Sequence, residues 1–118
     1  MLNQKLVSNV YLACGSTDMR KSIDGLAIIV QMSFKLDPFS HAMFVFCNAK
    51  RDKLKILYWE NNGFWLYYRR LEKGRFSWPD RSGDRVLPIT ERQLRWLLDG
   101  LDLHQKGAHR AVPQRKLI

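Results

Sequence analysis

The chain has 118 residues and a formal net charge of +9 at neutral pH. This length allows one hydrophobic core and excludes two independent ones, while an apolar content of 46% spread along the sequence excludes a disordered chain. So high a positive charge favours a polyanionic partner, either nucleic acid or an anionic membrane surface.

The sequence also bears on cellular location. Residues 1–5 lack the apolar core of a secretion signal, and no later segment approaches the roughly 20 apolar residues that span a bilayer. Cys14 and Cys47 lie in strand-like apolar runs, which suits buried free thiols in a reducing compartment. We therefore expect a cytoplasmic protein that does not associate with a membrane.

The first third of the chain predicts a strand, a helix and a second strand. Residues 10–15 are typical of a short buried strand, and residues 16–18 supply the turn and N-cap chemistry that opens a helix over residues 17–33. Residues 37–40 break the helical pattern, and the β-prone run 43–47 favours a central strand. The apolar positions at helical spacing are Met19, Ile23, Leu26, Ala27 and Val30.

A β-hairpin is predicted next. Two β-type runs, residues 54–59 and 64–71, are joined through residues 60–63, where Asn62-Gly63 is a strong hairpin signal. An even-length loop places alternate residues on the same side, so both sides are largely apolar and both need cover. One side carries Leu54, Ile56, Tyr58, Trp65, Tyr67, Arg69 and Leu71. The other, which we expect to be the more exposed, carries Lys55, Leu57, Trp59, Phe64, Leu66, Tyr68 and Arg70.

The last third predicts two short strands and a helix. Residues 75–78 alternate polar with aromatic before Pro79, which indicates an edge strand, and residues 86–89 indicate one more strand. Thr90 and Gln93 form a capping-box pattern that opens a second helix. Its apolar stripe is Leu94, Leu97, Leu98 and Leu101.

Together these elements predict an α+β fold. An antiparallel β-sheet of about four to six short strands is expected to pack with two amphipathic α-helices. We expect a single domain over residues 1–103, followed by a basic, flexible C-terminal tail over residues 104–118.

The chain lacks the residue patterns that most catalytic sites require. Metal-dependent nucleases need clustered carboxylates, often with a lysine two residues beyond one of them, and no acidic residue of this chain has lysine at that spacing. Zinc ligands would come as closely spaced pairs, and the cysteines and histidines offer no Cys-x-x-Cys and only one loose histidine pair, His104 and His109. We therefore expect no enzyme, no catalytic residue, no metal and no cofactor, although a nuclease of unrecognised type stays open as a third hypothesis.

A basic and aromatic stretch over residues 53–81 remains. Lysine and arginine neutralise phosphates, and aromatic faces stack on exposed bases for about 1–3 kcal/mol each, but the same aromatic residues can equally be core. The residues predicted to bind nucleic acid are Lys55, Arg70, Lys73, Arg75 and Arg81, with Arg20 and Lys21 from the first helix. The residues predicted for a partner interface are Trp59, Tyr68 and Trp78.

Several blocks in order carry a family resemblance. They include Val10-Tyr11-Leu12-Ala13-Cys14-Gly15, Thr17-Asp18-Met19-Arg20-Lys21, Gly63-Phe64-Trp65-Leu66-Tyr67-Tyr68, Gly74-Arg75-Phe76 and Trp78-Pro79. Over about residues 10–101 the chain resembles TnpB, the Orf2-like accessory protein of the IS-sixty-six family of bacterial insertion sequences. The resemblance implies a role in DNA transposition beside a separate transposase that carries the catalytic acidic residues. The motif residues Thr17, Asp18, Arg20, Lys21, Arg70, Gly74 and Trp78 are family-pattern positions without an implied catalytic role.

Two hypotheses follow for the function. The first is a non-catalytic accessory factor of transposition that binds DNA through the basic aromatic hairpin. The alternative is a protein–protein interaction module that docks on the transposase without touching DNA. The sequence is compatible with a homo-oligomer and leaves the number of subunits open, as it does the choice between duplex and single-stranded DNA.

Overall fold

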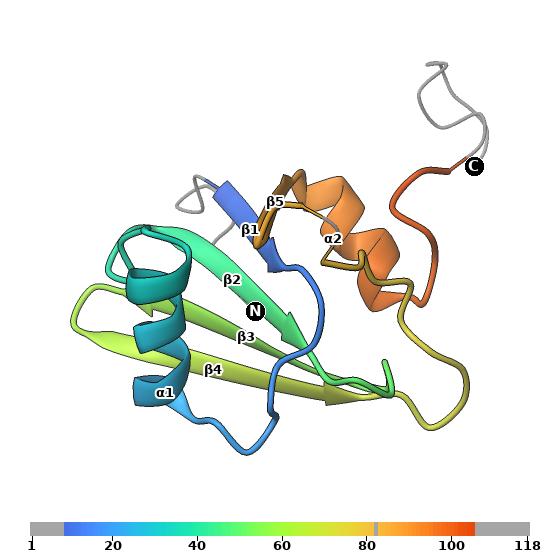
Figure 1. Ribbon diagram of the computed structural model, residues 1–118, viewed down its shortest axis with the longest axis horizontal. Helices are drawn as coiled ribbons and strands as arrows, with labels where there is room; N and C mark the ends of the chain where they lie inside the picture. The colour runs from blue at the N-terminus through green and yellow to red at the C-terminus, as the bar shows by residue number, and fades with distance from the viewer. Residues whose placement is uncertain (1–8, 82, 106–118) are drawn as a thin grey trace.

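The computed structural model describes residues 9–81 and 83–105 and confirms an α+β fold (Figure 1). Five strands form one sheet in the order β4-β3-β2-β1-β5. The strands are β1 (Asn9–Ala13), β2 (Ala42–Cys47), β3 (Lys53–Glu60), β4 (Gly63–Arg70) and β5 (Val86–Ile89). The helices are α1 (Ile23–Ile28), which continues as the π-helical turn η2 (Ile29–Ser33), and α2 (Glu91–Leu98).

The sheet is mixed, so the antiparallel pairing predicted from the sequence is confirmed for three of the four strand pairs and wrong for the fourth. Strands β1 and β2 pair in parallel, with Leu12 opposite Val45, and the other three pairs are antiparallel. The parallel pair arises because the chain from β1 to β2 passes through α1, a crossover that returns it to the same edge of the sheet. All six residues of β2 are buried, as predicted for a central strand.

Each face of the sheet is covered by one helix. The predicted hairpin parity is confirmed, because Tyr58 pairs with Trp65 and Leu57 pairs with Leu66. The face of Tyr58 packs with α2 through Leu97, and the face of Leu57 packs with α1 and η2. Both helices therefore cover core, and in Figure 1 α1 crosses β2, β3 and β4 while α2 lies beside β1 and β5.

The hairpin is confirmed, with its turn shifted by one residue from the Asn-Gly signal. Glu60 pairs with Gly63, so the two turn residues are Asn61 and Asn62. Asn61 supplies the positive φ of 57°. Asparagine tolerates this region because its short polar side chain can hydrogen-bond locally.

The first helix begins later than predicted, at Ile23 with Ser22 as its N-cap, and not at residue 17. Residues 16–18, which have the side chains of a helix N-cap, lead into a turn instead. The Asp18 carboxylate accepts from the Arg20 backbone N–H at 2.9 Å and from the Arg20 guanidinium at 2.7 Å. The Thr17 N–H donates to the Cys47 carbonyl at 2.7 Å, which keeps the chain extended across the end of β2.

Residues 75–78 do not form the predicted edge strand, since the edges of the sheet are β4 and β5. The segment is instead held by burial of Phe76 and by hydrogen bonds to other parts of the fold. Phe76 is 2% exposed and its N–H donates to the Arg51 carbonyl at 2.6 Å, while Trp78 Nε1 donates to the Ala13 carbonyl at 2.9 Å. The alternating pattern therefore reflects two aromatic anchors on the core and not a strand.

The capping box of α2 is confirmed. Thr90 Oγ1 accepts from the Gln93 N–H at 3.0 Å, and Gln93 Oε1 accepts from the Thr90 N–H at 2.9 Å. The predicted stripe is wrong at Leu101, which follows the helix and is 44% exposed. Gly100, with φ of 80°, ends the helix in a Schellman motif, as the Leu101 N–H donates to the Trp96 carbonyl at 2.8 Å.

The remaining expectations concern the cysteines, the tail and the membrane. Cys47 is buried and Cys14 is half-buried, and both are free thiols. The predicted basic tail falls, from residue 106 onward, outside the described residues. Within residues 9–81 and 83–105, no helix has the length and apolar character needed to cross a bilayer.

Candidate functional site: a basic pocket at one edge of the sheet

The topology gathers three loops at one end of the strands. Strands β1, β2 and β4 end there, and β3 and β5 begin there. The loops 14–22, 48–52 and 71–85 therefore lie next to one another (Figure 1). The carboxyl ends of parallel strands are where open sheets with crossover helices usually bind ligands.

Backbone hydrogen bonds tie the first loop to the third. The Cys14 N–H donates to the Arg85 carbonyl at 2.9 Å, and the Gly15 N–H donates to the Pro79 carbonyl at 3.0 Å. The middle loop joins them through Arg51, whose guanidinium donates to the Gly15 carbonyl at 2.7 Å. These contacts hold the three loops in one fixed arrangement.

Gly15 lets the loops approach closely. Its φ is +79°, in the left-handed region that L side chains rarely adopt. A Cβ at this position would lie 3.1 Å from the Arg81 Cβ, closer than carbon atoms normally pack. The lack of a side chain at Gly15 therefore permits the observed position of Arg81.

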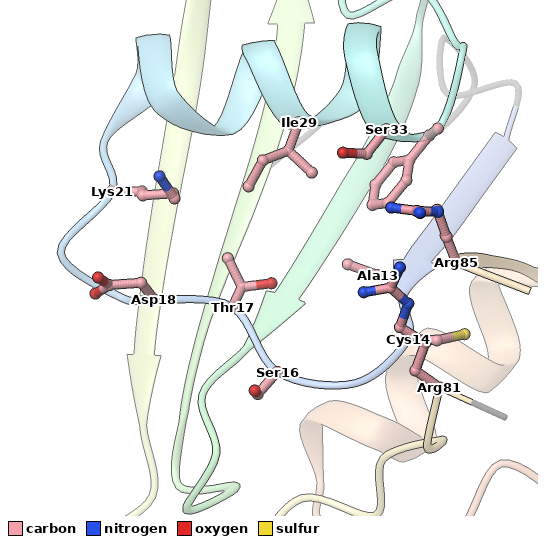
Figure 2. A pocket seen from close by; sticks show the side chains of 11 residues that line it. Ala13, Cys14, Ser16, Thr17, Asp18, Lys21, Ile29, Ser33, Arg81 and Arg85 are labelled. Carbon is pink, nitrogen blue, oxygen red and sulfur yellow. The ribbon is translucent and has the colours of Figure 1, made fainter.

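A pocket of about 210 Å³ lies between these loops and the helix (Figure 2). In Figure 2, Arg81 and Arg85 reach toward it from one side, Lys21 and Asp18 border the other side, and Thr17 lies between them. The side-chain nitrogens of Lys21, Arg81 and Arg85 form no hydrogen bond or ion pair within residues 9–81 and 83–105. The full lining is Ala13, Cys14, Ser16, Thr17, Asp18, Lys21, Ile29, Ser33, Phe34, Arg81 and Arg85.

The one carboxylate of the lining is already engaged. Asp18 forms an ion pair with Arg20 at 2.7 Å, and the hydrogen bonds from Arg20 lower the pKa of Asp18 to about 2. It therefore stays ionised at neutral pH and pairs with a cation outside the pocket lining. The Cys14 thiol, by contrast, has a raised pKa because of burial and the nearby Asp84, so it is protonated at neutral pH.

This arrangement suits an anion. Three cationic side chains around one hollow each attract an anion, and because all three are exposed, solvent screens each attraction, so binding depends on the three acting together. The hydroxyls of Ser16, Thr17 and Ser33 add neutral donors. In the described part of the chain, no three His, Cys, Asp or Glu side chains lie where they could hold a metal ion.

The structure disperses the residues that were predicted to bind nucleic acid. Lys21 and Arg81 line the pocket. Lys55 Nζ donates to the Met19 and Lys21 carbonyls at 2.7 and 2.9 Å, so its ammonium is occupied within the fold. The other four are exposed. Arg20 forms an ion pair with Asp18, and Arg70 forms one with Glu72. Lys73 and Arg75 form no ion pair with any described residue.

A second hollow of about 560 Å³, more open than the first, shares Asp18 with it and brings several predicted residues together. Tyr68, 53% exposed, stands at its rim on β4. The remaining residues that line it are Asp18, Met19, Arg20, Lys53 and Lys55.

The predicted partner-interface residues differ in exposure. Trp59 is half-buried and packs edge-on against Phe39 and Phe64, with ring centroids 5.0 Å apart in both cases. Trp78 is half-buried and fixed by its hydrogen bond to Ala13. Tyr68 is the exposed one, and Trp65 on the opposite face of β4 is exposed to 51%.

Sequence reasoning missed Arg85, Ser16 and Ser33 as site residues. Residues 80–84 look like an ordinary polar loop before a strand, so the sequence alone does not mark Arg85 as a site residue. The signal that could have found it is the pair Arg81 and Arg85, two arginines around a short polar loop. These arginines reach the site because β5 pairs with β1, which places their loop beside the Thr17-Asp18 motif. Local sequence patterns do not reveal this pairing.

Comparisons with known proteins place these residues in a wider context. Residues 8–108 match the family described as IS66 Orf2 like protein. Two relatives from Sinorhizobium fredii (strain NBRC 101917 / NGR234) are described as uncharacterized proteins. One, y4hO, is 39% identical over 93 residues, which cover 79% of this chain and 80% of the relative. The other, y4jC, is 30% identical over 93 residues, 79% of each chain, and no solved structure matches.

Proposed function

The chain belongs to the IS66 Orf2-like family, and from this membership we propose that it is a non-catalytic accessory protein of DNA transposition that binds DNA. DNA binding is supported by a set of cationic side chains that form no hydrogen bond or ion pair with described residues and lie in the loops at one end of the strands. Lys21, Arg81 and Arg85 surround the pocket, and Lys73 and Arg75 project from the same loop as Arg81. Cutting of the DNA would belong to a separate transposase.

Two features support DNA over a small anion. The net charge of +9 far exceeds what a single bound anion would neutralise. The loop 71–85 also carries cations both inside and outside the pocket, so a strand could contact several of them in succession. Phosphate contacts of this kind dominate the affinity of proteins for nucleic acid.

The proposal predicts salt-dependent binding to the element's terminal DNA. Fluorescence anisotropy at several salt concentrations should give a log–log slope of about −0.9 per phosphate contact on duplex DNA and about −0.7 on single strands. Replacing Lys73 and Arg75 by glutamine should weaken binding and flatten the slope. The matched control is R92Q/R95Q on α2, which makes the same charge change outside the loop 71–85. No binding by the wild-type protein at low salt would refute the proposal.

A second candidate, docking on the transposase, is favoured by the exposed aromatic residues of β4. This strand is an edge of the sheet, so its outer backbone groups have no strand partner among the described residues. Trp65 and Tyr68 stand exposed on its two faces. Aromatic residues beside a free strand edge are typical of surfaces that accept another chain.

Co-purification with the transposase tests this candidate. Y68A/R70A should reduce recovery of the transposase if β4 is the docking edge. The matched control is I28A/M32A, which removes exposed apolar side chains from α1 and η2 instead. Recovery that is unchanged by Y68A/R70A would exclude the face of β4 that carries these two residues as the interface, whatever the DNA-binding result.

A further inference from the structure

We propose that the pocket between loops 14–22 and 71–85 binds one phosphate group of DNA, held by Arg81 and Arg85 on one side and by Lys21 on the other. The choice of DNA as the source of the phosphate rests on the proposed function. The pocket itself rests on its own geometry (Figure 2).

The charges of the lining specify an anion. Three cationic side chains border the hollow, and none of them is hydrogen-bonded or ion-paired to another described residue. The single carboxylate of the lining, Asp18, is paired with Arg20. An entering anion thus meets three cations that form no hydrogen bond or ion pair of their own with the described residues. Three carboxylates lie nearby: Asp18 acts electrostatically on Lys21, Asp80 pairs with Arg51, and Asp84 lies near Cys14.

The donor types specify phosphate among anions. Guanidinium groups match the oxygens of phosphate with two parallel hydrogen bonds, and lysine adds a point charge. Hydroxyls of Ser16, Thr17 and Ser33 can satisfy further oxygens that a carboxylate would not offer. A pocket of about 210 Å³ admits a tetrahedral group together with part of its sugar.

The walls are fixed before any ligand enters. Gly15 is held by Pro79 and by Arg51, and Cys14 is held by Arg85 through the backbone. Trp78 anchors the same loop to Ala13. Because these bonds already fix the residues that they join, binding would not need to order those residues, which favours affinity.

Cys14 lines the pocket and provides a built-in reporter. We expect inorganic phosphate, compared with chloride at equal ionic strength, to slow alkylation of Cys14 by iodoacetamide, a neutral reagent. An occupying anion would cover the thiol and oppose formation of the thiolate. Peptide mapping by mass spectrometry follows each cysteine, and the buried Cys47 reports any unfolding.

The variant R81Q/R85Q should lose this protection while keeping the thermal stability of the wild type, because both side chains are exposed. The control R92Q/R95Q should retain it. With DNA as the ligand, R81Q/R85Q should also reduce the salt slope by about 0.9 for each duplex phosphate that the protein no longer neutralises. Comparing 5′-phosphorylated with unphosphorylated oligonucleotides identifies the source: protection that needs the end phosphate indicates a strand end, and equal protection indicates an internal phosphate.

The outcomes separate this inference from the proposed function. DNA binding that persists with an unchanged salt slope in R81Q/R85Q, together with an alkylation rate of Cys14 that neither phosphate nor DNA alters, would overturn the pocket and leave DNA binding intact. Protection by inorganic phosphate in a protein that does not bind DNA would support the pocket and refute the proposed function.

Discussion

Gly15 shows how much of the site depends on a single residue. Its positive φ turns the chain out of β1, and its missing side chain makes room for Arg81. Its carbonyl accepts from Arg51, and its N–H donates to Pro79. One residue thus takes part in contacts to two other loops, and its positive φ together with the closeness of the Arg81 Cβ is why glycine suits this point.

The chain supplies a matched control for this claim. Gly15 and Gly74 have almost the same φ, +79° and +78°, but a Cβ at Gly74 would meet nothing within 4 Å. Replacing either glycine by alanine should cost about 1–2 kcal/mol of unfolding free energy for the left-handed backbone, measured by urea denaturation. Gly15→Ala should cost more, because it also pushes on Arg81, and should weaken phosphate protection of Cys14. Equal destabilisation of the two variants, with protection unchanged, would show that the contact with Arg81 is unimportant.

At the scale of elements, the sequence predicted what local chemistry determines. The hairpin, the central strand and the capping box of α2 each depend on residues close together in the chain, and all three are confirmed. The hairpin parity is also confirmed, because an alternating side-chain pattern follows directly from an even loop.

The failures came where one residue type can serve two structures. Asp18 is a good N-cap residue, but its carboxylate bonds to Arg20 in a turn, so α1 starts at Ile23. The segment 75–78 has the alternation of a strand, but Phe76 and Trp78 are anchored to Arg51 and Ala13. In both cases a contact between neighbours or with a distant loop decided the structure, and periodicity alone does not reveal such contacts.

At the scale of the whole molecule, the site could be predicted only in part. The sequence predicts Lys21 and Arg81 as binding cations and marks Thr17-Asp18 as a family pattern. That these segments meet depends on β5 pairing with β1, a contact between opposite ends of the described chain. The prediction that the basic hairpin itself contacts DNA stays untested, and the geometry draws attention instead to the loops beside it.

The same sheet order has a consequence for how the chain folds. Strands β2, β3 and β4 pair with their neighbours in sequence, whereas β1 and β5 can pair only after the chain has closed a long loop. Loop closure costs entropy that grows with loop length, so local pairs are expected to form first. We expect Ile56→Ala, in β3, to slow refolding and Ile89→Ala, in β5, chiefly to speed unfolding, as read from stopped-flow chevron plots.

Refolding slowed as much by Ile89→Ala as by Ile56→Ala would show that the β1–β5 pair forms early. If the expected order holds, a folding intermediate would contain a finished hairpin but no anion site, because Cys14 and Arg85 meet only when the last strand joins. Nascent chains could then display their aromatic edge before they are able to hold a phosphate.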